Sequence, residues 1–212
     1  YVVGAPGLEV ILKGNLPTRE ELFRFLRLDP KKKILLVTQH PVSEEYEEAG
    51  KQMQETIAAV KNFNMPAVLI YPHADAGGRK IIGAINKEKN NPLFRVFPNL
   101  PHKYFLALER EAAVWIGNSS GAIIESSSFR TPVVNVGTRQ KGRQHGNNII
   151  NTGYDRKEII AAINKSLNDS KYIEKLSKIN NPYGDGKTGV RIVKILENLK
   201  LDKKLLIKQI TY

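Results

Sequence analysis

The sequence predicts an α/β protein built on a doubly wound, parallel β-sheet. Short apolar runs alternate along the chain with longer amphipathic segments, which is the pattern of repeated β-α-β units. Ile34–Thr38 is a largely apolar run of the kind that is buried on both faces of a parallel sheet. Small and polar residues follow the predicted strands, at the edge where open α/β sheets bind ligands. Because no internal repeat or linker interrupts this pattern, we expect residues 1–212 to form a single Rossmann-like domain with right-handed crossovers.

The first residues of the chain precede this regular alternation. Tyr1–Gly7 is interpreted as the end of a strand that enters a turn, and Leu8–Lys13 as a short helix. Thr18 is a predicted helix cap. The apolar residues expected on one face of that helix are Leu22, Phe23, Phe25 and Leu26. A domain that opened with a strand at Tyr1 would lack a strand partner, so we expect the chain to be a fragment.

From Lys33 onward, predicted strands and helices alternate. The six predicted strands are Ile34–Thr38, Ala67–Tyr71, Phe94–Phe97, Ala112–Ile116, Pro132–Val136 and Asn147–Ile150. The predicted helices are Ser43–Asn62, Gly78–Lys89, Pro101–Arg110, Ala122–Phe129, Asp155–Leu167, Tyr172–Ile179 and Val190–Leu199. Ser43 and Asp155 are placed at helix starts because their side-chain oxygens can accept hydrogen bonds from the first helical turn.

The stretch Ile116–Arg139 carries the strongest functional signal. Its turn Gly117–Gly121 lies between a predicted strand and a predicted helix, where unpaired N–H groups and the helix dipole favour an anion such as phosphate. Glu125 follows Ser120 by five positions, about 7 Å along a helix, where a carboxylate could accept both hydroxyls of a ribose. The alternative is structural, since Asn, Ser and Gly are ordinary capping and turn residues.

Four polar loops follow predicted strands and therefore meet at one edge of the sheet. Their residues are Thr38–Pro41, Pro72–Gly78, Asn118–Ser120 and Gly137–Arg143. The convergence of Gly, Ser, His and Arg in these loops favours a binding site for a phosphate-bearing ligand.

Composition narrows the range of partners. A formal charge of +12 suggests an acidic partner, but the longest basic run is Lys31–Lys33 and no basic patch is interleaved with aromatic residues. We therefore expect neither nucleic acid nor a membrane as the partner, and interpret most of the charge as solvated surface. No apolar run reaches the roughly 18 residues of a membrane helix, and no leader sequence opens the chain. We expect a cytoplasmic location.

Cysteine is absent, which excludes disulfides and thiolate metal sites. The four histidines do not fall at the spacing of metal ligands. The sequence therefore predicts no metal and no cofactor.

Several motifs are more specific than turn chemistry requires. In chain order they are His40–Val42, Asp75–Gly77, GNSSGAIIE at Gly117–Glu125, TPVVNVGTRQKGR at Thr131–Arg143, Asn147–Ile149 and Tyr183–Gly186. Together they resemble the C-terminal domain of UDP-N-acetylglucosamine 2-epimerases, which have the two-domain GT-B architecture. The resemblance covers most of the chain. It is closer to the hydrolysing branch, which makes N-acetylmannosamine for sialic acid synthesis.

The resemblance implies a binding site for UDP or a UDP-sugar. Ser119 and Ser120 would take the diphosphate, Glu125 the ribose, and Arg139 the nucleotide side of the cleft. For Arg139, the alternative is a surface cation near a strand end, whereas planar bidentate phosphate recognition is the functional interpretation.

The resemblance also implies roles in the UDP site for three further residues. His40 would be the catalytic residue, lying beside the leaving diphosphate, and Leu100 would lie in a segment that contacts uracil through its backbone. His73 is counted with the UDP-binding residues, although the hydrolysing branch can have Asn there. His40 alone could equally be a structural residue at a strand end. Beside a diphosphate it would be protonated and would stabilise the departing UDP.

The resemblance also implies an N-terminal catalytic domain that this chain lacks. On that basis residues 1–15 would be the interdomain connection, and residues 187–212 would be helices that cross back to the absent domain. We expect the full-length enzyme to be a homo-oligomer. Two alternatives remain: the donor domain of a GT-B glycosyltransferase, which would also bind a nucleotide sugar, and a basic nucleic-acid module, which lacks a recognisable motif here.

Overall fold

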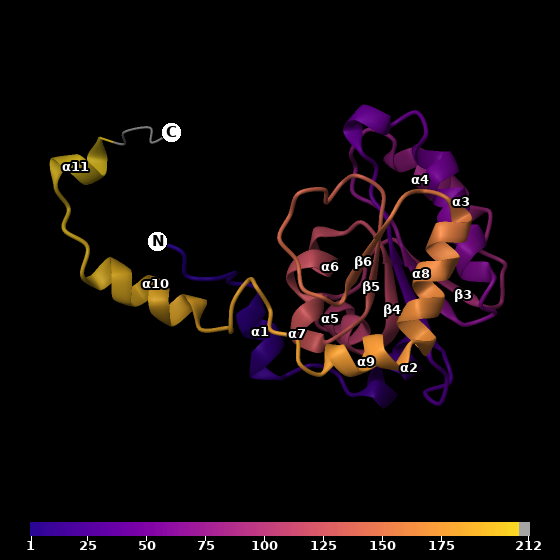
Figure 1. Cartoon of the computed structure of the whole chain (residues 1–212), viewed down its shortest axis with the longest axis horizontal. Helices are drawn as coiled ribbons and strands as arrows, with labels where there is room; N and C mark the ends of the chain where they lie inside the picture. Colours follow the sequence, from indigo (N-terminus) through magenta and orange to yellow (C-terminus); the bar gives the residue numbers. More distant parts are fainter. Residues whose placement is uncertain (208–212) are drawn as a thin grey trace.

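A computed structural model describes residues 1–207 of the chain. It contains a six-stranded parallel sheet in the order β3-β2-β1-β4-β5-β6, flanked by helices (Figure 1). The strands are β1 Ile34–Thr38, β2 Ala67–Ile70, β3 Phe94–Phe97, β4 Ala112–Gly117, β5 Val133–Val136 and β6 Ile149–Thr152. This order, with the chain running outward in both directions from β1 and β4, is that of a doubly wound fold, so the predicted fold class is confirmed.

The helices before β4 connect or cover the first half of the sheet. They are α1 Leu8–Lys13, α2 Arg19–Leu26, the short η1 Ser43–Glu45, α3 Ala49–Lys61, α4 Gly78–Asn86 and α5 His102–Glu111. The later helices are α6 Ser120–Ile124, α7 Ser126–Phe129, α8 Arg156–Asn168, α9 Ser170–Leu176, α10 Thr188–Glu197 and α11 Lys203–Leu206.

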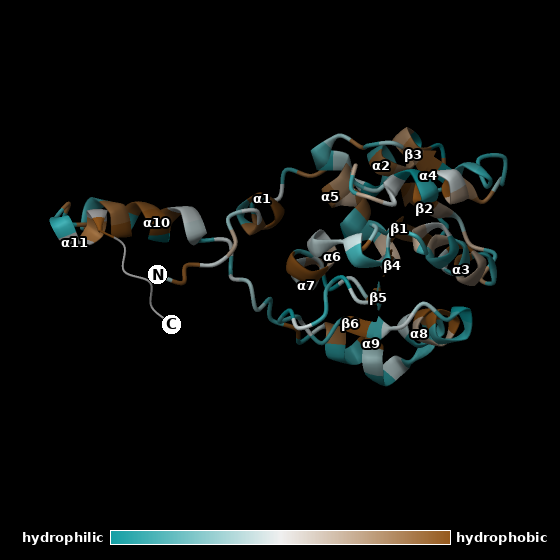
Figure 2. Cartoon of the chain, turned by 90° about the horizontal axis from the view of Figure 1, so that it is seen from above, coloured by the Kyte–Doolittle hydropathy of each residue, from teal (hydrophilic) through white to brown (hydrophobic). Residues whose placement is uncertain are grey.

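The core consists of two apolar layers, one on each face of the sheet. Strand side chains alternate between them: Leu35 and Val37 pack with α3, α4 and α8, whereas Ile34 and Leu36 pack with α2, α5 and α6. Seen from above, the strands lie in a row between these helix layers (Figure 2). Because both faces are covered, the strand sequences are almost continuously apolar. The loops at the strand ends are left to carry the polar chemistry.

The N-terminal segment pairs with the loop before α10 beside this body. Residues 1–7 form no strand, contrary to prediction; instead, Ala5 N–H donates to the Tyr183 carbonyl at 2.7 Å. Thr188 Oγ1 donates to the Val3 carbonyl at 3.2 Å, which fixes the start of α10. From there α10 and α11 extend away from the sheet (Figure 1). A backbone that pairs with the loop before α10 is not available for a strand.

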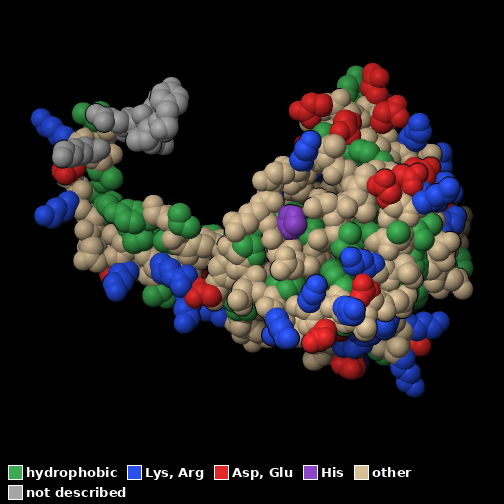
Figure 3. Space-filling view, in the orientation of Figure 1, with side chains coloured by type: hydrophobic (Ala, Val, Ile, Leu, Met, Phe, Trp, Pro, Cys, Tyr) green, Lys and Arg blue, Asp and Glu red, His purple; other side chains and the backbone are tan. Residues whose placement is uncertain are grey.

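Helix α10 exposes apolar side chains along its length (Figure 3). Val190, Val193 and Leu196 are 71%, 53% and 60% exposed, and their spacing of three residues places them along one side of the helix. Of the segment 187–212, which was expected to cross to another domain, residues 208–212 lie outside the described part of the chain.

Two predicted helices differ from the observed ones in ways that matter for the site. The helix expected from Ser43 is only the short η1, and α3 begins at Ala49, because the Glu45 side chain is engaged by residues from other loops. The helix expected over Ala122–Phe129 is split at Glu125 into α6 and α7. Ser126 Oγ donates to the Ala122 carbonyl at this break, a bond of the kind that bends helices.

Smaller differences concern element ends. The last strand begins at Ile149 rather than Asn147, because the Asn148 side chain is buried and bonded to Ser127, Ser126 and Thr131. Helices α9 and α10 each begin and end two to three residues before the predicted ranges. Within residues 1–207 no helix has both the length and the apolar character needed to span a bilayer.

Candidate functional site

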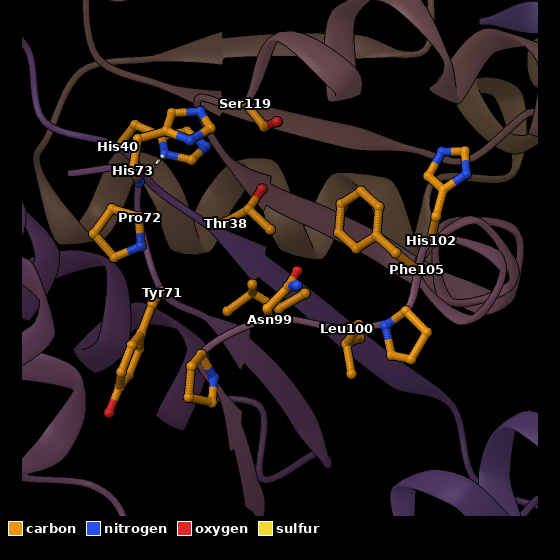
Figure 4. A pocket seen from close by; sticks show the side chains of 13 residues that line it. Thr38, His40, Tyr71, Pro72, His73, Asn99, Leu100, His102, Phe105 and Ser119 are labelled. Atoms are coloured by element: carbon orange, nitrogen blue, oxygen red, sulfur yellow. Dashed lines mark hydrogen bonds between the residues drawn. The ribbon is translucent and has the colours of Figure 1, made fainter. Parts of the chain in front are cut away.

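A crevice lies where β1 and β4 are neighbours and the chain winds away in opposite directions. At this switch point the loops after adjacent strands diverge and leave space for a ligand. A cavity of about 540 Å³ opens there (Figure 4). It is lined by Thr38, His40, Ile70, Tyr71, Pro72, His73, Pro98, Asn99, Leu100, Pro101, His102, Phe105 and Ser119. The sheet thus brings together loops after β1, β2, β3 and β4.

Asn118 connects the loops after β1 and β4. Its side chain is 1% exposed and binds the backbone of His40 twice: His40 N–H donates to Oδ1 at 2.7 Å, and Nδ2 donates to the His40 carbonyl at 2.9 Å. Gly117 precedes it with φ +128°, and a Cβ there would lie 2.0 Å from the Thr38 carbonyl oxygen. Only glycine permits this approach. The backbone position of His40 is therefore set by β4.

The His40 ring is stacked on the ring of His73. The two centroids are 3.9 Å apart with an angle of 7° between the planes, and His73 N–H donates to His40 Nδ1 at 3.2 Å (Figure 4). When Nδ1 accepts a hydrogen bond in a neutral imidazole, Nε2 carries the proton. The hydrogen-bond network thus assigns Nε2–H of His40 as a donor.

His40 is neutral in the structure. Burial, the charge of His73 and the charge of Arg139, in that order, lower the pKa of His40 from 6.5 to about 3. The imidazole is therefore neutral near pH 7. The prediction of a protonated His40 applies to a site that holds a diphosphate, whose negative charge would favour the imidazolium.

Arg139 comes from the loop after β5. It is half-buried, and its Nη1 donates to the Asn118 carbonyl at 3.1 Å, which also accepts Gln140 Nε2 at 2.8 Å. Burial lowers the pKa of Arg139, the Asp75 carboxylate raises it, and Arg143 lowers it again. A guanidinium has five N–H donors, so one bond to Asn118 leaves a fork available for an anion.

Glu45 fastens the loop that carries Arg139. Its Oε1 accepts from Thr138 Oγ1 at 2.7 Å, and its Oε2 accepts from Tyr154 OH at 2.7 Å and from Gln52 Nε2 at 2.8 Å. Burial alone would raise the pKa of Glu45, but these three hydrogen bonds lower it on balance. A second cavity, of about 490 Å³, lies here between the loops after β1, β2 and β5.

The predicted diphosphate and ribose residues lie in one short segment. Ser119 is the N-cap of α6, with its Oγ accepting from Gly121 N–H at 3.2 Å, and Ser120 is the first helical residue. Glu125 ends α6, and a Cβ built on Gly121 would lie 3.5 Å from both Glu125 Oε2 and Ser119 Oγ. The carboxylate and the hydroxyl therefore face the same space.

The opposite wall of the larger cavity is the connection between β3 and α5. The Leu100 side chain is buried, whereas its neighbours Pro98, Asn99 and Pro101 are exposed; all four residues line the cavity (Figure 4). The anchored Leu100 side chain fixes the backbone of this segment. That backbone groups near Leu100 contact a base stays a prediction.

The sequence analysis assigns no role of their own to Asn118, Glu45 and Glu109. Asn118 enters it only as a member of the turn Gly117–Gly121 and of a polar loop. Glu109 falls three positions after Leu106 and four after Phe105, on the apolar stripe of α5. A carboxylate on an apolar stripe is a signal that sequence analysis could have used.

No cluster of three or more His, Asp or Glu that could hold a metal ion occurs in the described part of the chain. The chemistry available consists of hydrogen-bond donors from His40, Ser119 and backbone N–H groups, one cation at Arg139, and the carboxylate of Glu125.

The fold places the chain in a class of proteins. A doubly wound parallel sheet with a crevice at its switch point is common among α/β domains that bind nucleotides. Among solved structures, the UDP-GlcNAc 2-epimerase of Neisseria meningitidis bound to UDP-GlcNAc is similar, with a TM-score of 0.73 and 19% identity. That likeness covers 93% of this chain and 55% of the other, and it agrees with one half of a GT-B enzyme.

The family follows from the sequence comparison. The profile of the family described as UDP-N-acetylglucosamine 2-epimerase matches residues 1–197, so the chain belongs to that family. A UDP-N,N'-diacetylbacillosamine 2-epimerase (hydrolyzing) of Legionella pneumophila is 34% identical over 208 residues, which are 98% of this chain and 54% of that protein. The polysialic acid biosynthesis protein P7 of Escherichia coli is 28% identical over 93% of this chain and 51% of its own length. The chain thus spans about half the length of these relatives.

Proposed function

We propose that this chain is the UDP-binding domain of a hydrolysing UDP-sugar 2-epimerase. The observation that carries the proposal is the arrangement of four residues in a family member: His40 and Ser119 line the larger cavity, Arg139 lines the second cavity, and Glu125 lies beside Ser119 at Gly121. The similarity to a relative named as hydrolysing supports the branch.

In the proposed complex, the diphosphate lies at the start of α6. Ser119, Ser120 and the first N–H groups of the helix donate to it, and the Arg139 fork binds its second side. The ribose hydroxyls donate to Glu125, and the base enters the larger cavity against the Leu100 segment. His73 lies above His40 and borders the same cavity.

The proposed reaction begins with loss of UDP from C1 of the sugar. A base removes the C2 proton as the C1–O bond breaks, which leaves an unsaturated sugar, and water then adds to release the epimerised sugar. Negative charge develops on the departing diphosphate, where Nε2–H of His40 can donate. Once the diphosphate is bound, its charge favours protonation of His40, which would strengthen this donation.

The nucleotide site is tested by calorimetry with UDP. Glu125→Ala and Ser120→Ala should each weaken UDP binding, with a loss of about 1.5 to 3 kcal/mol for the charge-assisted ribose contact. Asn147→Ala, at an exposed position outside both cavities, is the control. Unchanged affinity in both site variants would refute the assignment.

The carboxylates that move the C2 proton are proposed to belong to an N-terminal domain. In this arrangement, residues 1–15 connect the domains and the apolar side of α10, with Val190, Val193 and Leu196, packs on the N-terminal domain. The isolated chain should then bind UDP weakly and release none from UDP-N-acetylglucosamine. Release by the 212-residue chain at the rate of a two-domain enzyme would contradict this division.

The sugar is proposed to be UDP-N-acetylglucosamine or a diacetamido relative, in cytoplasmic synthesis of sialic acid or a related surface sugar. The alternative is a donor domain of a GT-B glycosyltransferase. Assay of the two-domain enzyme with both sugars separates these proposals: free UDP without an acceptor supports the hydrolysing epimerase, and UDP release that requires an acceptor supports the transferase.

A further inference from the structure

A second carboxyl group lies behind Glu125. Glu109, in the last turn of α5, is fully buried, and its carboxyl lies within hydrogen-bonding reach of the Glu125 side chain. Within residues 1–207, neither Glu109 oxygen receives a hydrogen bond from an N–H or hydroxyl donor. The UDP site described above does not account for this residue.

Basic side chains of α5 and α2 pair with Glu111 and not with Glu109. Arg110 Nε donates to Glu111 Oε1 at 2.8 Å, and Arg19 Nη1 donates to Glu111 Oε2 at 2.7 Å. The charged group that acts on Glu109 is the carboxylate of Glu125. Two adjacent carboxylates cannot both remain ionised without a large electrostatic penalty, so one of them holds a proton.

The proton lies on Glu109. Burial first, and then the negative charge of Glu125, raise the pKa of Glu109 well above its ordinary value of 4.5. Glu109 is fully buried whereas Glu125 is half-buried, so desolvation acts mainly on Glu109. A neutral carboxyl has one O–H donor, and the oxygens of the Glu125 side chain can accept it.

We propose that Glu109 is a positioning residue that donates a hydrogen bond to Glu125 and fixes the Glu125 carboxylate for the ribose hydroxyls. An ionised carboxylate has about four acceptor positions, so one bond from Glu109 leaves room for two hydroxyls. The inference rests on the proposed UDP site and assigns the group that sets its preference for ribose.

The backbone around Glu109 is held firmly enough for this role. Thr131 Oγ1 donates to the Glu109 carbonyl at 2.8 Å, and the preceding Ala107 and Leu108 are buried with Ala122 and Ile123 of α6. The end of α5 is therefore packed on the helix that ends at Glu125. A donor on a rigid support restricts the side chain it binds more than a mobile donor does.

The test compares two variants of the 212-residue chain that differ in whether the side chain at position 109 can donate a hydrogen bond. Glu109→Met removes the donor with little change in shape, whereas Glu109→Gln retains an N–H donor. Calorimetry with UDP and 2′-deoxy-UDP gives the preference for ribose. Glu109→Met should lower the ratio of UDP affinity to 2′-deoxy-UDP affinity about threefold to tenfold, and Glu109→Gln should keep this ratio near the wild-type value.

The ratio of the two affinities is the readout, because a general loss of stability would weaken the binding of both nucleotides alike and leave their ratio unchanged. A wild-type ratio in Glu109→Met, or an equal loss in Glu109→Met and Glu109→Gln, would overturn the proposal. Wild-type chain that binds neither nucleotide would instead refute the UDP site.

A second measurement does not require a nucleotide. The folded pKa of Glu109 lies above its unfolded value, so the folded state retains the proton and the contribution of Glu109 to stability falls as pH rises above about 4.5. Compared with Glu109→Gln, the wild-type chain should therefore lose stability between pH 5 and 8 in urea titrations. The same comparison in a Glu125→Gln background should show a smaller loss. Parallel stability curves for wild type and Glu109→Gln would overturn the shared proton.

Discussion

The two walls of the crevice are built differently. On one wall, which we call the tied wall, hydrogen bonds join separate loops. The Asn118 side chain binds the His40 backbone, the Arg139 side chain binds the Asn118 carbonyl, and the side chains of Glu45 and Thr138 bind each other. The other, the open wall, is the segment Pro98–Pro101, held by the buried Leu100 side chain and by prolines. In the proposed complex, the charge that changes during the reaction lies at the tied wall and the flat base lies at the open wall.

This difference has a physical reason. A donor to a developing negative charge must be placed within a few tenths of an ångström, so its loop is fixed by several hydrogen bonds. A base that contacts backbone groups requires only that the segment keep its path. Substitutions on the tied wall should therefore have large effects, and shape-preserving substitutions on the open wall should have small ones.

The largest effect is expected for His40→Asn in the two-domain enzyme. Loss of the Nε2–H donor should lower kcat on the order of a hundredfold or more, with little change in KM, because the bond strengthens as UDP departs. Arg139→Ala should instead raise KM, since it binds charge already present on the nucleotide. Steady-state kinetics of both variants, with His145→Asn as the control, would show this contrast. A normal kcat in His40→Asn would make His40 a structural residue.

Asn118→Ala should cost stability as well as activity. The replacement leaves the N–H and the carbonyl of His40 without partners in a buried position, which should lower the free energy of unfolding by about 2 to 3 kcal/mol. Urea unfolding of the 212-residue chain measures this. The exposed Asn147→Ala should change it by less than about 0.5 kcal/mol. Equal values for the two variants would show that the tied wall does not depend on Asn118.

The neutral His40 makes the tied wall sensitive to acid. The pKa of His40 is about 3 in the folded state and 6.5 in the unfolded state, so between these pH values His40 takes up a proton only when the chain is unfolded. The free energy of unfolding therefore falls as pH decreases from 6.5 to about 3. The loss is at most about 1.4 kcal/mol per pH unit. The stability difference between wild type and His40→Asn should shift in favour of the variant as pH falls from 6.5 to 4.5. A constant difference would mean that His40 is not neutral when folded.

Glu45→Gln should weaken binding without abolishing the reaction. The amide has one acceptor oxygen in place of two, so it cannot accept from Thr138, Tyr154 and Gln52 as the carboxylate does, and the Arg139 loop is less well fixed. We expect KM for the UDP-sugar to rise about tenfold, with kcat changed much less. The exposed Glu48→Gln is the matched control. A lower kcat at constant KM would assign Glu45 a different role.

The smallest effect is expected on the open wall. Leu100→Met conserves volume and leaves the backbone path of residues 98–101 intact, so UDP affinity should change by less than about threefold. Calorimetry would detect a larger change. A tenfold loss would show that the Leu100 side chain itself recognises the ligand.

Much of this protein could be predicted from its sequence. All six strands, the parallel doubly wound order and the meeting of four loops at one edge follow from apolar runs and their spacing, because a strand buried on both faces leaves a local signature. The GNSSGAIIE segment contains the cap and the start of α6, which are adjacent in sequence, whereas its role as an anion site stays a prediction.

Only the tertiary structure shows which residues far apart in the chain form hydrogen bonds with each other. Asn118 binds His40 across 78 positions and Glu45 binds Thr138 across 93, and neither pairing has a local pattern. The same holds for charge: His40 is neutral and Glu109 protonated because of burial and neighbours that the fold brings together. The local sequence determines the spacing of apolar residues and the preferred backbone conformation. The ionisation of a side chain depends instead on the exclusion of solvent and on charges within a few ångströms, and both exist only once the chain is folded.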